Sequence, residues 1–174
     1  MLALLASAFI QTGCSTTSKT PSCCAKEVAA DQPVSDKSLF QLDSTWTNDK
    51  SRELKLGALR GRPLVVTMFF AKCEYACPVL VHDMKKVEGA LPENVSTNIG
   101  FVLVSFDTER GTPDDVLELA ALLGVKFKKD ARGQFAHSNI LTVLNSGGEV
   151  AHQQIGLNQP PDETVKHLVQ LLHP

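Results

Sequence analysis

The chain has 174 residues and a formal net charge of −2; 43% of its residues are hydrophobic and 21% are charged. This balance is typical of one folded domain with an N-terminal extension, and it excludes a chain that is disordered throughout. No stripe of Lys and Arg is present to attract a polyanion, so nucleic-acid binding is excluded as a function class.

The first 14 residues are predicted to be an export signal. Residues 2–10 form an uncharged apolar run that matches the hydrophobic part of a signal peptide and is too short to cross a bilayer. Small residues then precede Cys14, as in the lipobox of bacterial lipoproteins, so we expect Cys14 to be acylated. The alternative is an uncleaved, truncated membrane anchor. Both interpretations place the rest of the chain in the cell envelope, attached to the membrane and facing the periplasm.

Residues 15–37 are rich in Ser, Thr, Pro and Ala and lack apolar periodicity, which predicts a flexible tether. The folded domain is expected to span residues 38–174. Its first element is predicted to be an additional β-hairpin between Leu39 and Leu56.

From Leu64 onward, apolar patterns predict alternating strands and helices. Continuous apolar runs indicate strands that are buried on both faces, and apolar residues at helical spacing indicate the helices between them. The expected order is a strand at 64–70, a helix through Leu80 to Leu91 that Pro92 stops, a strand at 99–106, a helix from Pro113, two hairpin strands at 140–144 and 149–155, and a helix from Pro160.

This order, β-α-β-α-β-β-α, is that of the thioredoxin topology, in which a right-handed crossover joins two parallel strands and a hairpin and helix follow. We therefore expect an α/β, thioredoxin-like fold. Its central mixed β-sheet should be flanked by helices and preceded by the extra N-terminal hairpin.

Two of the five cysteines, Cys73 and Cys77, lie where the first buried strand gives way to a helix. Residues four apart share one face if the helix has begun, and thiols at a helix N-terminus face N–H groups that favour the thiolate. Two such sulfurs can bind one metal ion or each other. A purely structural disulfide is disfavoured because it would constrain very little chain.

Thiolates favour Cu(I), zinc or iron–sulfur clusters, but structural zinc and most clusters need four protein ligands. Cu(I) is satisfied by two or three ligands, so it fits best if a histidine joins the two cysteines. His137 lies in a loop that packs beside the cysteine turn in thioredoxin-like folds and often holds a cis-proline there. The other histidines are expected at the surface: His82, His152, His167 and His173.

Three segments together resemble the Sco/SenC family of copper-binding assembly proteins. They are the C-x-x-x-C-P motif at 73–78, the stretch at 105–113 and His137-Ser138, and the resemblance extends from about Ser35 to the C-terminus. It implies a periplasmic or intermembrane-space protein that binds copper, as Cu(I) or Cu(II), through Cys73, Cys77 and His137. It also implies a role in building the dinuclear copper centre of cytochrome c oxidase. The implied partner is the copper-bearing subunit of the oxidase, or another periplasmic copper client.

The chain departs from the family pattern at three points. The family's usual proline after the first cysteine is Glu74 here. An Asp commonly precedes the family's histidine, but Ala136 stands here, so no carboxylate at this position orients the imidazole. The segment from Pro113 to His137 has room for one helix, whereas the family usually has a helix, a strand and another helix.

Two functions remain open from the sequence. The first is a copper metallochaperone that holds one copper ion per chain, a binding and transfer protein more than an enzyme. The second is a thiol–disulfide oxidoreductase in which Cys73 and Cys77 cycle between dithiol and disulfide. A peroxidase of this fold is disfavoured because Phe70 stands where Thr or Ser would be needed. Cys23 and Cys24 in the tether either capture copper or are an incidental pair.

Overall fold

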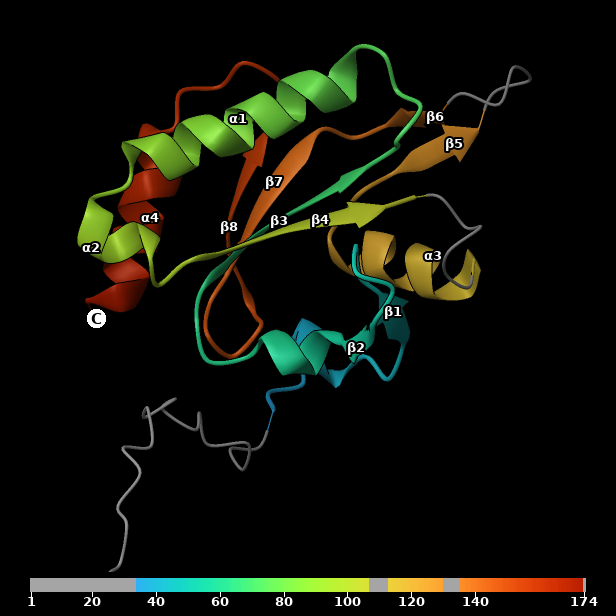
Figure 1. The fold of residues 1–174 in the computed structure, drawn as a ribbon, viewed down its shortest axis with the longest axis horizontal. Helices are drawn as coiled ribbons and strands as arrows, with labels where there is room; N and C mark the ends of the chain where they lie inside the picture. The colour runs from blue at the N-terminus through green and yellow to red at the C-terminus, as the bar shows by residue number, and fades with distance from the viewer. Residues whose placement is uncertain (1–33, 107–112, 130–134, 174) are drawn as a thin grey trace, which may run out of the picture.

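The computed structural model describes residues 34–106, 113–129 and 135–173 (Figure 1). The expected export signal with Cys14, and the tether cysteines Cys23 and Cys24, lie outside the described residues. The elements in chain order are the 3-10 helix η1 (Leu39–Gln41), β1 (Thr45–Thr47), β2 (Glu53–Lys55), the 3-10 helix η2 (Leu56–Leu59), β3 (Leu64–Phe69), α1 (Ala76–Ala90), α2 (Glu93–Ser96), β4 (Gly100–Ser105), α3 (Pro113–Leu122), β5 (Phe127–Lys129), β6 (Phe135–His137), β7 (Ile140–Leu144), β8 (Val150–Ile155) and α4 (Asp162–Leu172).

The central sheet has four strands in the order β4-β3-β7-β8. Strand β3 pairs with β4 in parallel and with β7 antiparallel, so the sheet is mixed. Helix α1 lies in the connection between β3 and β4, as a parallel pair requires. Strands β1 and β2 form an antiparallel hairpin ahead of the sheet. The α/β, thioredoxin-like fold and the N-terminal hairpin are therefore confirmed.

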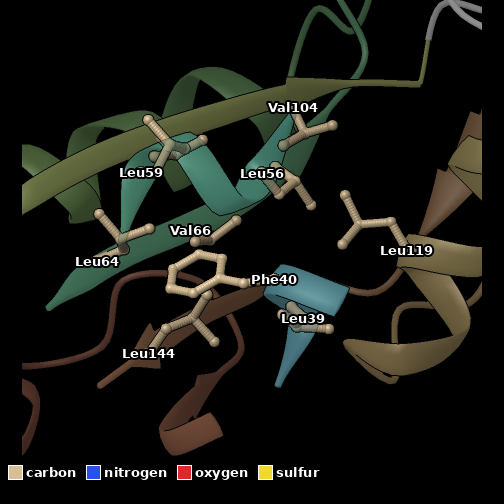
Figure 2. Close-up of a pocket in the computed structure, with 10 residues that line it drawn as sticks. Leu39, Phe40, Leu56, Leu59, Leu64, Val66, Val104, Leu119 and Leu144 are labelled. Carbon is tan, nitrogen blue, oxygen red and sulfur yellow. The ribbon is translucent and has the colours of Figure 1, made fainter. Parts of the chain in front are cut away.

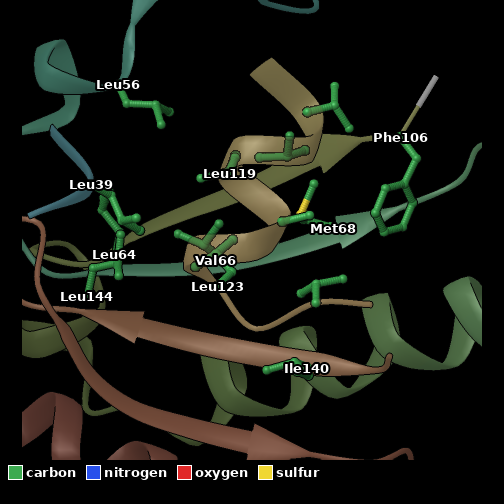
Figure 3. Packing of buried hydrophobic residues seen from close by; sticks show 14 of the residues in the cluster. Leu39, Leu56, Leu64, Val66, Met68, Phe106, Leu119, Leu123, Ile140 and Leu144 are labelled. Carbon is green, nitrogen blue, oxygen red and sulfur yellow. The ribbon is translucent and has the colours of Figure 1, made fainter. Parts of the chain in front are cut away.

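Helices α1 and α4 cover one face of the sheet and α3 covers the other (Figure 1). Alternate residues of β3 enter two separate clusters: Val66 packs with Leu119 of α3 and with Leu123, which follows that helix, and Val65 packs with Leu80 of α1 and Leu168 of α4. Figure 3 shows the α3 side of this packing. A strand covered on both faces has no polar side, which explains its continuous apolar run.

The 3-10 helices η1 and η2 pack on the α3 side of the sheet, at the end opposite the cysteine motif. Figure 2 shows a gap there, lined by Leu39, Phe40, Leu56, Leu59, Leu64, Val66, Val102, Val104, Leu119 and Leu144. All of these side chains are apolar, so the gap offers no polar side chain that could orient a ligand. It belongs to the core.

Helix α1 ends at Ala90 with Leu91 as its C-cap, so it stops before Pro92 as expected, and Pro92 then caps the one-turn helix α2. One expected placement is wrong. His137 does not lie in a loop, because it is the last residue of β6, which pairs with β5 in a short hairpin. Each of these strands has only three residues, too few for an alternating pattern to indicate them.

The topology brings the predicted site residues to one end of the sheet. Strand β3 ends just before the cysteine motif, and β7 begins just after His137; since the two strands are antiparallel, these positions adjoin. The N-terminal segment joins the opposite end, where the N–H of Leu39 donates to the carbonyl of Gly148 at 2.9 Å. Within the described residues, no helix has the length and apolar character needed to span a membrane.

Candidate metal centre

Cys73 and Cys77 lie on either side of the start of α1. The helix begins at Ala76, so Cys77 is in its first turn and Cys73 is in the loop before it. The N–H of Phe70 donates to Sγ of Cys77 at 3.3 Å, and the N–H of Cys77 donates to Sγ of Cys73 at 3.4 Å. Both cysteines are free thiols in the structure. Each sulfur therefore receives a backbone hydrogen bond, and the one on Cys73 comes from the first turn of the helix, where N–H groups favour a thiolate.

The two thiols differ in acidity because they differ in exposure. Burial raises the pKa of Cys77 to about 11; the Phe70 hydrogen bond offsets part of this rise, and the neighbouring Cys73 adds to it. At the partly exposed Cys73 the effect of burial is smaller. There, hydrogen bonds from the N–H groups of Cys77 and Tyr75 and from the side chain of Cys77 lower the pKa to about 7. In the metal-free protein at neutral pH, Cys73 is the more ionised thiol.

His137 presents one ring nitrogen to this pair. Its Nε2 lies 3.2 Å from Sγ of Cys77, and its Nδ1 lies 3.0 Å from the carbonyl oxygen of Ser138. A carbonyl oxygen can only accept a hydrogen bond, so Nδ1 carries the proton and Nε2 is left with its lone pair facing the sulfur. The Ser138 carbonyl thus orients the ring, which Ala136 on the other side of His137 has no polar side chain to do.

One ligand atom from each of Cys73, Cys77 and His137 lies within 4.8 Å of the other two. In the described part of the chain, this is the only group of three or more His, Cys, Asp or Glu side chains placed to hold a metal ion. Two sulfurs and one imidazole form a soft donor set that suits Cu(I), or zinc with a fourth ligand added. The structure therefore brings together the three residues that the sequence singled out.

The other histidines lie elsewhere. His82 and His173 are exposed, as expected. His152 on β8 and His167 on α4 are only partly exposed, because their rings stack with centroids 4.1 Å apart. His167 is at the surface but is partly covered, and the amphipathic pattern of α4 does not indicate which β8 side chain lies beside it.

Two further contacts of His137 were not expected from the sequence. One is the Ser138 carbonyl, a backbone group that no side-chain motif marks. The other is Phe106, whose ring centroid lies 5.3 Å from that of the imidazole. In the sequence, Phe106 is indistinguishable from any apolar residue at the end of a buried strand.

Solved structures similar to this chain confirm the fold. A putative electron transfer protein from Aquifex aeolicus has a TM-score of 0.68 at 19% identity, covering 78% of this chain and 93% of its own. ScoI from Arabidopsis thaliana with copper bound has a TM-score of 0.65 at 16% identity, covering 75% and 96%. A SCO1/SenC family lipoprotein from Bacillus anthracis has a TM-score of 0.62 at 17% identity, covering 74% and 92%.

No curated protein matches the chain in sequence. The family profile of SCO1/SenC, in contrast, matches residues 33–167. This match includes the whole cysteine motif, the histidine and most of the 174-residue chain. The chain therefore belongs to the SCO1/SenC family.

Proposed function

We propose that this protein is a copper metallochaperone that holds one copper ion between Cys73, Cys77 and His137. The observation that carries the proposal is the gathering of two Sγ atoms and one imidazole nitrogen within 4.8 Å. Membership of the SCO1/SenC family and the similarity to an Arabidopsis ScoI with copper bound support the same metal.

The surroundings of the three donors suit an ion that is bound and then passed on. Cys77 and the nearby core exclude water from one side, since Cys77 is only 4% exposed. Cys73 and His137 are partly exposed, and Tyr75 beside them is 78% exposed. A client's ligands can therefore approach from the Cys73 side, while Cys77 keeps its hold on the ion.

The client in this proposal is the copper-bearing subunit of cytochrome c oxidase or another periplasmic copper protein, as family membership suggests. The protein would work from the membrane surface through a lipid on Cys14. The apolar run before Cys14 supports this anchor, as does the Bacillus anthracis relative described as a lipoprotein. Mass spectrometry of the mature protein would test it, and an intact segment 1–10 would contradict it.

The copper site is tested by anaerobic Cu(I) titration of the soluble domain from about Ser35, with thiols counted before and after. The wild type should bind one equivalent, and Cys73→Ser or Cys77→Ser should each abolish tight binding because one thiolate and one imidazole make a poor Cu(I) site. His82→Ala, at an exposed histidine of α1, is the matched control and should bind like the wild type. Unchanged stoichiometry in either cysteine variant would reject the site.

A second candidate function is a thiol–disulfide reductase in the same compartment. It is supported by the pKa of about 7 at the partly exposed Cys73 and of about 11 at the buried Cys77. Such a difference is typical of a pair in which one thiolate attacks a client disulfide and the second thiol resolves the mixed disulfide. His137 distinguishes the two candidates, because only the copper site needs its imidazole as a ligand.

A further inference from the structure

Three aromatic rings pack together beside the cysteine pair. The ring of Phe106 is fully buried, with its centroid 4.7 Å from that of Phe127 and 5.3 Å from that of His137. The ring planes are tilted by 42° and 50°, a favourable arrangement for aromatic pairs at these separations. Phe127 and His137 lie directly opposite each other on β5 and β6, so their side chains share one face of the hairpin.

The two halves of the metal centre belong to different sheets. Cys77 follows β3 of the central sheet, whereas His137 lies on β6, which pairs with β5 in a separate two-stranded sheet among the strands described. Among the described strands, no ladder of hydrogen bonds joins β6 to β3. The separation of the imidazole from the sulfur therefore depends on the short link from His137 to β7 and on side chains that pack the hairpin against the central sheet.

Phe106 is placed to make that connection. The N–H of Phe106 donates to the carbonyl of Phe69 at 2.8 Å. Phe70, which follows Phe69 in the chain, donates its own N–H to Sγ of Cys77. The backbone of Phe106 is thus fixed to the strand end that binds the sulfur, while its ring contacts the imidazole. The Ser138 carbonyl sets the tautomer, but it comes from the adjoining residue and moves with the hairpin.

We propose that Phe106 is a positioning residue of the metal centre, and that its ring holds the β5–β6 hairpin where Nε2 of His137 faces the cysteine sulfurs. The proposal rests on the proposed copper function. The side chain of Phe106 has no donor atom for a metal ion, so it acts through His137. Its removal should therefore loosen the imidazole and leave both thiols in place.

The test uses the full chain carrying Phe106→Leu, which removes the ring and keeps an apolar side chain. Cu(I) affinity, measured by competition with a chromophoric chelator, should fall by about tenfold or more, as when a group that orients a ligand is lost. The thiolate-to-Cu(II) absorption band and the electron paramagnetic resonance signal should change as well. Phe101→Leu is the matched control: Phe101 lies on β4, the strand that Phe106 directly follows, but packs in the other cluster, so the variant should lower thermal stability without changing affinity or spectra.

A double-mutant cycle separates positioning from general destabilisation. If Phe106 acts through the imidazole, Phe106→Leu should cause little further loss of affinity in a His137→Ala background. An equal loss in both backgrounds, or wild-type affinity and spectra in the single variant, would overturn the proposal while leaving the copper function intact. A wild-type chain that binds no copper would overturn both.

A second variant covers the case in which Phe106→Leu does not fold. Phe127→Leu removes the ring that packs on Phe106 and faces His137 from β5. It should lower affinity in the same direction by a smaller factor and show the same non-additivity with His137→Ala. Wild-type copper affinity in a folded Phe127→Leu protein would count against the proposal.

Discussion

Two regions of this molecule bring imidazoles into close contact, with different chemical results. In the first, which we call the metal pole and define as Cys73, Cys77 and His137, an in-plane nitrogen faces a sulfur at 3.2 Å. The second region is the side of the molecule formed by α1, β8 and α4, which we call the α4 face. There, the rings of His152 and His167 stack at an interplanar angle of 12°. The lone pair of an imidazole lies in its ring plane, so two stacked rings 4.1 Å apart cannot direct both lone pairs at one ion.

The difference shows that residue type alone does not make a metal site. At the metal pole, the Ser138 carbonyl and the aromatic contact with Phe106 determine where the nitrogen points. On the α4 face, the stacked pair joins a helix to a strand. A buried carboxylate completes this region: Asp83 of α1 accepts the N–H of Asn158 at 2.6 Å and pairs with Lys86 at 3.0 Å.

The largest effect is expected from His137→Ala compared with His152→Ala. The first should weaken Cu(I) binding by orders of magnitude, because it removes the only non-sulfur ligand; the second should leave the affinity unchanged. Chelator competition measures both. An equal loss of Cu(I) affinity in the two variants would contradict the inference that the metal pole, and not the α4 face, binds copper.

The same His137 variant also separates the two candidate functions. The Cys73–Cys77 disulfide should still form and be reduced in His137→Ala, since that cycle needs only two sulfurs. In a strain that lacks the native protein, failure to assemble cytochrome oxidase despite intact thiol cycling would support the chaperone function. Assembly at the wild-type level would reject copper transfer through this site and favour the reductase. Thermal melting must first show that the variant is folded.

The next effect is on stability and concerns the α4 face. Asp83→Ala should lower the free energy of unfolding by about 2–3 kcal/mol, because the N–H of Asn158 loses its charged, buried acceptor and Lys86 loses its partner. Copper affinity should not change. Glu163→Ala is the control, since the pair of Glu163 with Lys166 is exposed on both sides and should contribute little. A loss of copper affinity in folded Asp83→Ala would show that the two regions are coupled.

A third prediction concerns the unequal thiols of the metal pole. In the metal-free protein near pH 7, iodoacetamide should modify Cys73 about tenfold faster than Cys77 or more, because the thiolate is the reactive form and the pKa values are about 7 and 11. The rate at Cys73 should rise with pH through a midpoint near 7. Peptide mass spectrometry measures both rates, and equal rates across this range would contradict the assigned acidities.

The smallest effect is expected at the stacked histidines. Burial, and then the nearby His167, lower the pKa of His152, while Glu163 partly opposes this. The unfolded chain therefore binds a proton more readily than the folded one, so the stability associated with a neutral His152 is present above the ordinary histidine pKa and is lost as pH falls through the lowered value. Unfolding midpoints in denaturant should fall on acidification, and less so in His152→Gln. The same fall in both proteins would assign it to other groups.

Much of the fold was predictable because local signals agreed with one another. The apolar run at 64–70 indicated a strand covered on both faces, and β3 is such a strand. Proline and acids at the start of the helix from Pro113 predicted α3 for a similar reason, since they favour the first turn whatever packs against it. The β5–β6 hairpin could not be predicted, because strands of three residues are formed by pairing and carry no periodic signal of their own.

The candidate site divides in the same way. The sequence by itself determined the chemistry of the donors: two thiols four residues apart at a strand–helix junction, and a histidine close enough in the chain to β7 to reach them. Only the tertiary structure decided the acidity of each thiol, through the burial of Cys77 and the exposure of Cys73. It also decided the orientation of the His137 ring, because the Ser138 carbonyl and the ring of Phe106, from a distant part of the chain, set that orientation. Donor type is a property of single residues, whereas burial and orientation arise only when separate segments pack together.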